Sequence, residues 1–252
     1  MKPARIAVAL GALAAPLWLA AQTPPIADNS FLIEEAYNQE PGVVQHISAF
    51  QLFRGADSWA YSFTQEWPLF SRKSQASFTL PVQHLPSGSA SVTGVGDVAL
   101  NYRYQVLDAD ARVAAAPRLS LLLPTGDRTA GLGTGALGAQ VNLPVSVAVT
   151  RKLVSHWNAG VTVTPATSAT GFNLGGSAVW LVRPAFNLLC EVAWTSADGL
   201  FVNPGIRWAH NLASGLQIVP GIAFPIGVGP SAGTDAVFLY LSLEHPFRSG
   251  ER

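Results

Sequence analysis

From about residue 43 onward, apolar and polar side chains alternate along the chain with a period of two. In the clearest stretch, 97–106, one face is wholly apolar or aromatic: Val98, Leu100, Tyr102, Tyr104 and Val106. The residues between them are Asp97, Ala99, Asn101, Arg103 and Gln105. Because successive side chains of a strand point to opposite faces of a sheet, the pattern predicts a β-strand with one apolar and one polar face.

Segments of this kind recur to the end of the chain, separated by turn residues. We count twelve of them, at 43–53, 59–68, 75–85, 97–107, 113–124, 138–150, 157–165, 172–182, 186–196, 201–210, 216–226 and 236–247. Most have roughly the 9 to 11 residues that a tilted strand needs to cross a membrane. The pattern therefore predicts an all-β fold: a transmembrane antiparallel up-and-down β-barrel of the outer-membrane type, with twelve strands.

The connections between these segments fall into two alternating sets. The short set lies at 71–74, 108–112, 151–156, 183–185 and 211–215. The other set, rich in Gly, Ser and Thr and mostly longer, lies at 54–58, 86–96, 125–137, 166–171, 197–200 and 227–235. Outer-membrane barrels have short periplasmic turns and longer extracellular loops, so this sorting favours a membrane barrel over a soluble β-sandwich.

Composition agrees with a β fold and removes several function classes. Charged residues make up only 12% of the chain and apolar residues 49%, with 23 glycines and 18 prolines. These values exclude a disordered chain and disfavour a helical one. Fifteen basic and fifteen acidic residues give a formal net charge of zero, which supplies no field to attract nucleic acid. The single cysteine, Cys190, excludes a disulfide framework.

The N-terminus has the pattern of a secretory signal peptide. Lys2 and Arg5 precede an uncharged run, 6–21, that ends in small residues and is shorter than the ~20 residues of a helical span. We expect cleavage after Ala21; the alternative is an uncleaved anchor helix. The chain then divides into four parts: 1–21, the signal peptide; 22–42, a periplasmic segment or a plug that enters the lumen; 43–247, the barrel; and 248–252, a C-terminal tail.

The last predicted strand resembles the C-terminal signal that the outer-membrane insertion machinery reads, which usually ends on an aromatic residue. Leu239, Leu241 and Leu243 alternate toward Phe247. His245 stands where an aromatic residue is common, and a short tail follows Phe247. We therefore expect outer-membrane lipids and the insertion machinery to be partners of this chain.

Polar residues on the second face of the strands predict a polar lumen, because charge at membrane depth is tolerated only where it faces water or a partner. The lumen-facing candidates are Glu66, Asp97, Asn101, Arg103, Arg118, Glu191, Arg207 and Glu244. Adjacent strands place Arg103 near Arg118, and Glu191 near Arg207 as a candidate ion pair. Such residues either orient a polar solute or cross-link and fill a narrow lumen.

Three stretches resemble the outer-membrane barrel family named for the meta-pathway of phenol degradation. They are "ADNSFLIEEAYNQEPGVVQHI" (27–47), "GVGDVALNYRYQV" (94–106) and "PRLSLLLPTGDRTAGLGTG" (117–135). The resemblance covers most of the chain after the signal peptide. It implies a transporter-like β-barrel that helps small, often aromatic, compounds cross the outer membrane, and it implies no catalytic residues.

A dinucleotide-binding fingerprint is the first alternative to weigh, because Gly133, Gly135 and Gly138 spell G-x-G-x-x-G. That fingerprint requires a helix to begin at the glycines and an acidic residue about 20 residues later. The residues after Gly138 instead alternate with period two and include Pro144, and no carboxylate stands at the required distance. The glycines therefore predict a loop with positive φ angles and close packing.

A lipid-modifying enzyme is the second alternative. His46 and Ser48 lie two residues apart on one face and resemble the His-x-Ser pair of the outer-membrane phospholipase, but the Asn-Gly of that family is missing. The other histidines are scattered, which indicates no metal site, and nothing indicates a cofactor. The sequence therefore predicts a channel for small molecules, aromatic or hydrophobic ones among them, and no enzyme; a closed structural or surface-interaction barrel is the main alternative.

Overall fold

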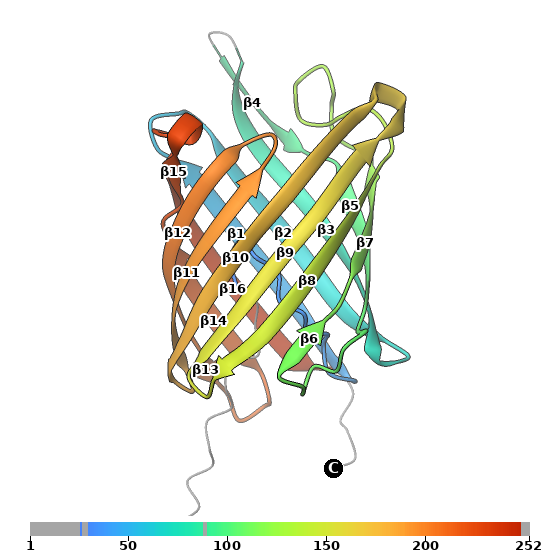
Figure 1. Cartoon of the computed structure of the whole chain (residues 1–252). Coiled ribbons are helices and arrows are strands. Elements are labelled where there is room, and N and C mark those ends of the chain that lie inside the picture. The colour runs from blue at the N-terminus through green and yellow to red at the C-terminus, as the bar shows by residue number, and fades with distance from the viewer. Residues whose placement is uncertain (1–25, 27–29, 88–89, 248–252) are drawn as a thin grey trace, which may run out of the picture.

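The computed structural model describes residues 26, 30–87 and 90–247. The predicted signal peptide, 1–21, and the predicted tail, 248–252, lie outside the described residues. Tilted strands surround a single lumen, and both ends of the described chain lie at the lower end of the barrel in Figure 1.

Sixteen strand segments and two short 3-10 helices follow one another along the chain. The strand segments are β1 (Val43–Phe53), β2 (Trp59–Leu69), β3 (Ser71–Ser87), β4 (Ala90–Val95), β5 (Val98–Tyr104), β6 (Val113–Ala115), β7 (Arg118–Leu123), β8 (Gly138–Thr150), β9 (Leu153–Thr164), β10 (Ala169–Arg183), β11 (Phe186–Thr195), β12 (Gly199–Trp208), β13 (His210–Asn211), β14 (Gln217–Ala223), β15 (Ile226–Val228) and β16 (Ala236–Pro246). The helices are η1 (Pro165–Thr167) and η2 (Gly229–Ser231). In the described part of the chain no helix is long and apolar enough to cross a membrane.

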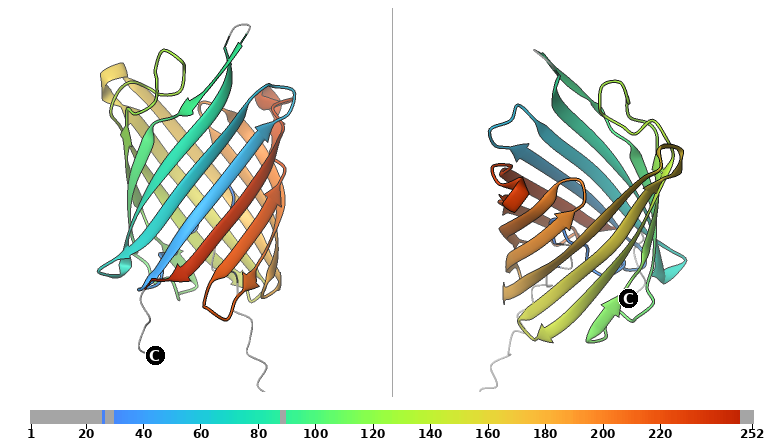
Figure 2. Two further views of the ribbon diagram at one scale, coloured as in Figure 1. Left: turned by 180° about the vertical axis from the view of Figure 1, so that it is seen from behind. Right: turned by 45° about the horizontal axis from the view of Figure 1, so that its top comes forward.

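These segments form twelve antiparallel barrel strands, because four strands are each interrupted once: β4 with β5, β6 with β7, β12 with β13, and β14 with β15. The barrel closes where the first strand meets the last, with β1 paired to β16 from Val43↔Pro246 to Phe53↔Ala236. Every neighbouring pair is antiparallel and each strand pairs with the next along the chain (Figure 2). The predicted fold class, an all-β antiparallel up-and-down barrel of twelve strands, is confirmed.

Two of the predicted connections are wrong. The loop expected at 86–96 is a β-hairpin, because β3 runs to Ser87 and pairs with β4 from Val82↔Val95 onward. Thr and Val at alternate positions of β4 favour this extended pairing, which rises above the barrel in Figure 1. The turn expected at 71–74 belongs to β3, and the chain reverses at Phe70, whose φ is 59°.

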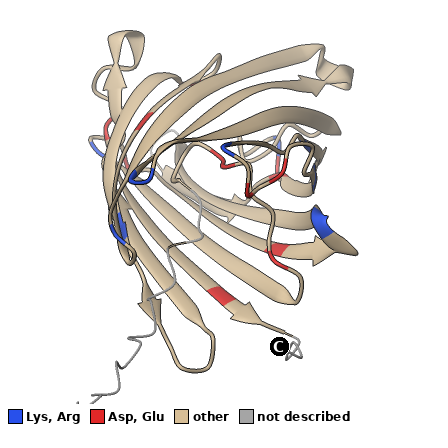
Figure 3. Cartoon of the chain, turned by 60° about the horizontal axis from the view of Figure 1, so that its bottom comes forward, with Lys and Arg blue, Asp and Glu red and all other residues tan. Residues whose placement is uncertain are grey.

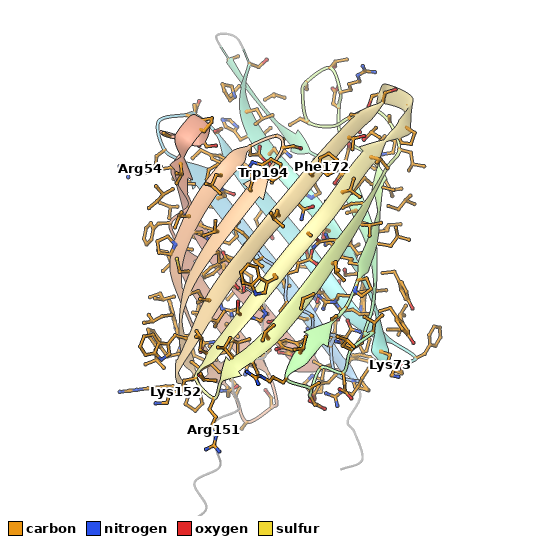
Figure 4. The ribbon with its side chains drawn as sticks, viewed as in Figure 1. Arg54, Lys73, Arg151, Lys152, Phe172 and Trp194 are labelled. Carbon is orange, nitrogen blue, oxygen red and sulfur yellow. The ribbon has the colours of Figure 1, made fainter. Side chains whose placement is uncertain are left out.

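The apolar face of the strands is on the outside of the barrel. In β5, Leu100 and Tyr102 are 46% and 43% exposed, whereas Asn101 and Arg103 between them are 7% and 5% exposed. Long stretches of the strands carry no charged residue (Figure 3). In Figure 4, Phe172 and Trp194 lie toward the upper end of the barrel, while Lys73, Arg151 and Lys152 lie at the lower end. An apolar band between aromatic and charged ends is the surface that a bilayer requires.

Candidate functional site

The inside of the barrel holds the N-terminal segment, which we define as residues 30–42. Residue Ile26 donates its N–H to the Pro184 carbonyl in the lower turn after β10 (3.2 Å). The chain then bends at 31–33 and returns to the lower end, where β1 begins at Val43. The segment therefore forms a loop within the lumen, visible as the blue trace inside the barrel in the right view of Figure 2.

The bend is held by one carboxylate. Glu191 on β11 is fully buried, and its oxygens accept the backbone N–H groups of Phe31 (2.9 Å), Leu32 (3.0 and 3.1 Å) and Ile33 (3.2 Å). The Asn203 side chain on β12 donates a further hydrogen bond to the same carboxylate (2.7 Å). A buried charge is tolerated only when it is hydrogen-bonded, and here the donors come largely from the N-terminal segment itself.

The part of the segment that returns toward β1 begins with Glu34, which contacts side chains of β7 and β9. Its carboxylate forms an ion pair with Arg118 (2.6 Å), and its backbone N–H donates to the Asn158 side chain (2.8 Å). The Asn158 amide in turn donates to the Glu34 carbonyl (2.7 Å), and Asn142 donates to Asn158 (3.3 Å). The Asn158 side chain on β9 thus satisfies both the N–H and the carbonyl of Glu34, and Asn142 on β8 supports that side chain.

Arg103 on β5 binds the next turn of the segment. Its guanidinium donates to the Asn38 side chain (2.9 Å) and to the carbonyls of Glu35 (3.2 Å) and Tyr37. It also lies 3.9 Å from the Glu66 carboxylate. The planar guanidinium of arginine donates to several acceptors in fixed directions, whereas the ammonium of lysine is a compact point charge on a flexible stem. Arg103 therefore holds the path of this turn more rigidly than a lysine would.

Two further contacts fasten the segment near the lower end. The N–H of Ala36 donates to the Ser146 hydroxyl (2.8 Å), and the N–H of Gln39 donates to Gln75 (2.7 Å). Gln75 then donates to Glu66 (2.7 Å). The segment is therefore tied to the wall along its whole described length.

Four of the predicted lumen residues, Arg103, Arg118, Glu191 and Arg207, contact this segment. Five of the predicted lumen residues are buried inside the barrel: Glu66, Asn101, Arg103, Glu191 and Arg207. Arg118 is half-buried beside Glu34 and stands directly opposite Arg103 in the strand register. Glu244 is opposite Gln45 and Gln217 in the register, at the lower end of β16.

The two residues of the candidate ion pair, Glu191 and Arg207, both lie beside the N-terminal segment. Glu191 accepts hydrogen bonds from the N-terminal segment, and the Arg207 guanidinium lies 5.9 Å from the centre of the Phe31 ring. The same segment therefore lies against both residues of the expected pair. Three residues that bind the segment are missing from the predicted lumen-facing candidates: Asn158, Ser146 and Gln75. The alternation of polar positions along their strands would have identified them.

Asp97 lies outside the strands and organises the outer loop at 125–137. Its carboxylate accepts the N–H (2.8 Å) and hydroxyl (2.7 Å) of Thr134 and the N–H of Gly126 (3.0 Å). Burial raises the pKa of Asp97, but these hydrogen bonds outweigh burial, so the pKa lies below its usual value. A Cβ on Gly133 would lie 2.4 Å from the Asp97 Oδ1 atom, and Gly135 has a φ of 68°. The glycines of the apparent fingerprint thus permit close packing and a positive φ, and β8 follows them in place of a helix.

Two cavities remain around the N-terminal segment. The first, which we call the outer vestibule, has a volume of about 740 Å³ and is lined mainly by small and apolar residues, among them Leu32, Phe53, Ala193, Phe201 and Pro225. The second, which we call the lumen cavity, has a volume of about 180 Å³. One of its walls is polar and comes from Ser62, Thr64, Ser77, Thr79 and Asn101. The adjoining part of the lining is largely apolar and comes from Phe31, Ile47, Ala49 and Tyr240.

The residues of the alternative enzyme site have separate partners. His46 Nε2 lies 3.2 Å from His245 Nε2, and the Ser48 hydroxyl lies 3.1 Å from the Tyr61 hydroxyl. Within residues 26, 30–87 and 90–247, no three His, Cys, Asp or Glu side chains lie close enough together to hold a metal ion. The hydrogen bonds and ion pairs described above therefore lie mainly in the lumen.

Comparison with solved structures finds a similar fold in proteins that are described as outer-membrane channels and porins. The COG4313 outer membrane channel from Pseudomonas putida F1 superimposes with a TM-score of 0.61 at 12% identity, over 83% of this chain and 97% of that one. The KdgM porin in complex with disordered oligogalacturonate gives a TM-score of 0.53 at 8% identity, over 82% and 99%. The NanC porin gives 0.54 at 7% identity, over 80% and 98%.

At these identities the similarity shows the fold: an outer-membrane type β-barrel. No family model and no curated protein matches this chain. Membership of the phenol meta-pathway family therefore stays a prediction from the three stretches quoted above.

Proposed function

We propose that the protein is an outer-membrane channel for small, uncharged molecules that have an apolar face. The observation that carries this proposal is the pair of cavities, which leave space inside the barrel on both sides of the bend at 31–33. A volume of 740 Å³ falls within the roughly 300–1,000 Å³ of typical small-molecule sites. The vestibule therefore has room for a small organic solute.

The charges along the lumen cavity favour a neutral solute. Its four charged lining residues form two ion pairs, Glu34 with Arg118 (2.6 Å) and Glu66 with Arg103 (3.9 Å). Because the two pairs balance, the cavity provides no net field that would concentrate an anion or a cation. Its adjoining polar and apolar lining residues suit a molecule with a hydroxyl group and an apolar ring, as the phenol-family resemblance implies.

The comparisons support a channel because the three matched proteins above are described as channels or porins, one of them in complex with oligogalacturonate. The N-terminal segment acts as a plug in this proposal, narrowing the lumen. A closed structural or surface-interaction barrel is the second candidate, and the observation that favours it is the continuous set of contacts between the segment and the wall.

The test is single-channel recording of the purified protein in planar bilayers. We expect openings in potassium chloride, and we expect an uncharged aromatic alcohol to block the current at lower concentration than a sugar alcohol of similar mass. Openings without this difference would contradict the solute preference. Absence of openings at every voltage and with both solutes would contradict the channel and favour the closed barrel.

The location of the protein belongs to the same proposal. We infer that it resides in the outer membrane, surrounded by lipid and inserted by the outer-membrane machinery through β16, which carries Leu239, Leu241 and Leu243 and is followed by Phe247. Cell fractionation should place the protein in the outer membrane, with heat-modifiable migration on a gel. Mass spectrometry of the isolated protein should find Gln22 as its first residue; a retained Met1 would contradict cleavage.

A further inference from the structure

The three residues of the bend differ in where their side chains point. Phe31 lies against β12 and β14, where a Cβ on Gly205 would be 2.5 Å from the Phe31 ring and a Cβ on Gly221 would be 2.7 Å from it. Ile33 lies against β10, where a Cβ on Gly175 would be 2.3 Å from the Ile33 Cδ1 atom. Glycines in the wall thus create the space into which the two flanking side chains fit.

Leu32 is placed between these two anchored residues. Both oxygens of Glu191 accept its N–H, and the neighbouring N–H groups bind the same carboxylate. The backbone of Leu32 is therefore fixed from the wall, while its half-buried side chain packs beside the apolar cluster of Ala223, Phe238 and Tyr240 and lines both cavities. A side chain presented to a passage from a fixed backbone has the position of a constriction.

The two cavities identify the passage. The outer vestibule is bounded by residues of the upper loops, such as Arg54 and Asp198, whereas the lumen cavity reaches down to Glu66 and Arg103. Among the residues that the structure describes, Leu32 is the one that lines both cavities. The Leu32 side chain therefore stands at the boundary between the vestibule and the lumen cavity.

We propose that the Leu32 side chain is the constriction between the outer vestibule and the lumen cavity, and that it sets the largest solute that the channel admits. This inference rests on the proposed channel function. The size limit then depends on one aliphatic side chain at the bend of the N-terminal segment. A substitution of that side chain should change the limit without changing the strands of the barrel.

The test compares single-channel conductance and block by polyols of increasing size in Leu32→Ala, Leu32→Trp and the native protein. Because the narrowest point controls flux, we expect Leu32→Ala to raise conductance about twofold and to admit larger polyols, and Leu32→Trp to lower it by a similar factor. Leu52→Ala is the matched control, since Leu52 also lies on the barrel's upper half but is 47% exposed on its outer face. Heat-modifiable migration establishes that each variant is folded.

The outcomes separate the two proposals. If the native protein and all variants fail to conduct, the channel function is wrong and the constriction with it. If the native protein conducts and both Leu32 variants behave like Leu52→Ala, the channel stands and the constriction is wrong. Misfolding cannot imitate the expected result, because the two Leu32 substitutions must change conductance in opposite directions.

Discussion

Both carboxylate oxygens of Glu191 accept the backbone N–H of Leu32, at distances of 3.1 and 3.0 Å. The side chain comes from the wall of the barrel and the N–H from a segment 159 residues earlier in the chain. A fully buried carboxylate needs donors, and the bend of the segment needs acceptors for consecutive N–H groups. Each satisfies the other, so the contact fixes the height at which the segment turns inside the lumen.

Replacing Glu191 with Gln tests this contact directly. The glutamine side chain keeps one acceptor oxygen, but its NH₂ group faces backbone donors, so roughly 1–3 kcal/mol of docking free energy should be lost. We expect hydrogen exchange of the amides of Phe31, Leu32 and Ile33 to become about tenfold faster or more. Glu40→Gln is the control, because Glu40 lies in the same segment but is exposed. Unchanged amide protection in Glu191→Gln would show that the carboxylate does not hold the bend.

The wall beside Ile33 should not accept even one added carbon atom. In Gly175→Ala, the new Cβ would lie 2.3 Å from Ile33 and 2.7 Å from the Val192 carbonyl oxygen, so we expect a loss of about 1–3 kcal/mol from overpacking. Gly171 lies on the same strand, and a Cβ there would meet no atom closer than 3.5 Å. Gly171→Ala should therefore unfold at the native temperature or slightly above it, whereas Gly175→Ala should unfold at a lower one. Equal unfolding temperatures, measured by gel migration after heating, would contradict the close approach of the segment.

The outer loop at 125–137 should loosen in acid. Because the pKa of Asp97 in the folded protein lies below that of the unfolded chain, its stabilising effect is fully present above the ordinary Asp value and is lost as the pH falls through the folded value. We expect the Gly126 and Thr134 amides to be protected from exchange at neutral pH and to lose protection below about pH 4. In Asp97→Asn the protection should be weaker and independent of pH, while Asp57→Asn, at an exposed position, should behave like the native protein. The same acid dependence in Asp97→Asn would assign the effect to another group.

The barrel itself follows from local patterns in the sequence. Alternation in stretches such as 97–106 predicts both the strands and the side of each residue, because a strand with period two has one face toward lipid and one toward the lumen. Four of the eight lumen candidates, Arg103, Arg118, Glu191 and Arg207, contact the N-terminal segment, and two more, Glu66 and Asn101, line the lumen cavity beside it. The hairpin of β3 and β4 was mistaken for a loop because its residues are small and polar, and its extended form depends on pairing above the barrel.

The arrangement inside the lumen was less predictable. A plug at 22–42 was one of two interpretations, since nothing in the local sequence distinguishes a segment inside the barrel from one outside it. The contacts that hold residues 30–42 come from Ser146, Asn158 and Glu191, which lie between 110 and 160 residues later. Many of the groups bound are backbone N–H and C=O groups, which every residue has and which therefore leave no mark in the sequence. The role of Leu32 depends on the shapes of two cavities and has no sequence pattern of its own.

The segment and its partners are far apart in the sequence, and this separation also affects the order in which parts of the protein fold. Contacts across 124 and 160 residues close large loops of chain, and closing such loops is slow. The strands that carry Asn158 and Glu191 must be paired before the segment has anything to bind, and β16 must arrive before β1 can complete the wall. The first described part of the chain is thus among the last to become ordered, so a barrel intermediate should exist whose lumen is still empty of its own N-terminal segment.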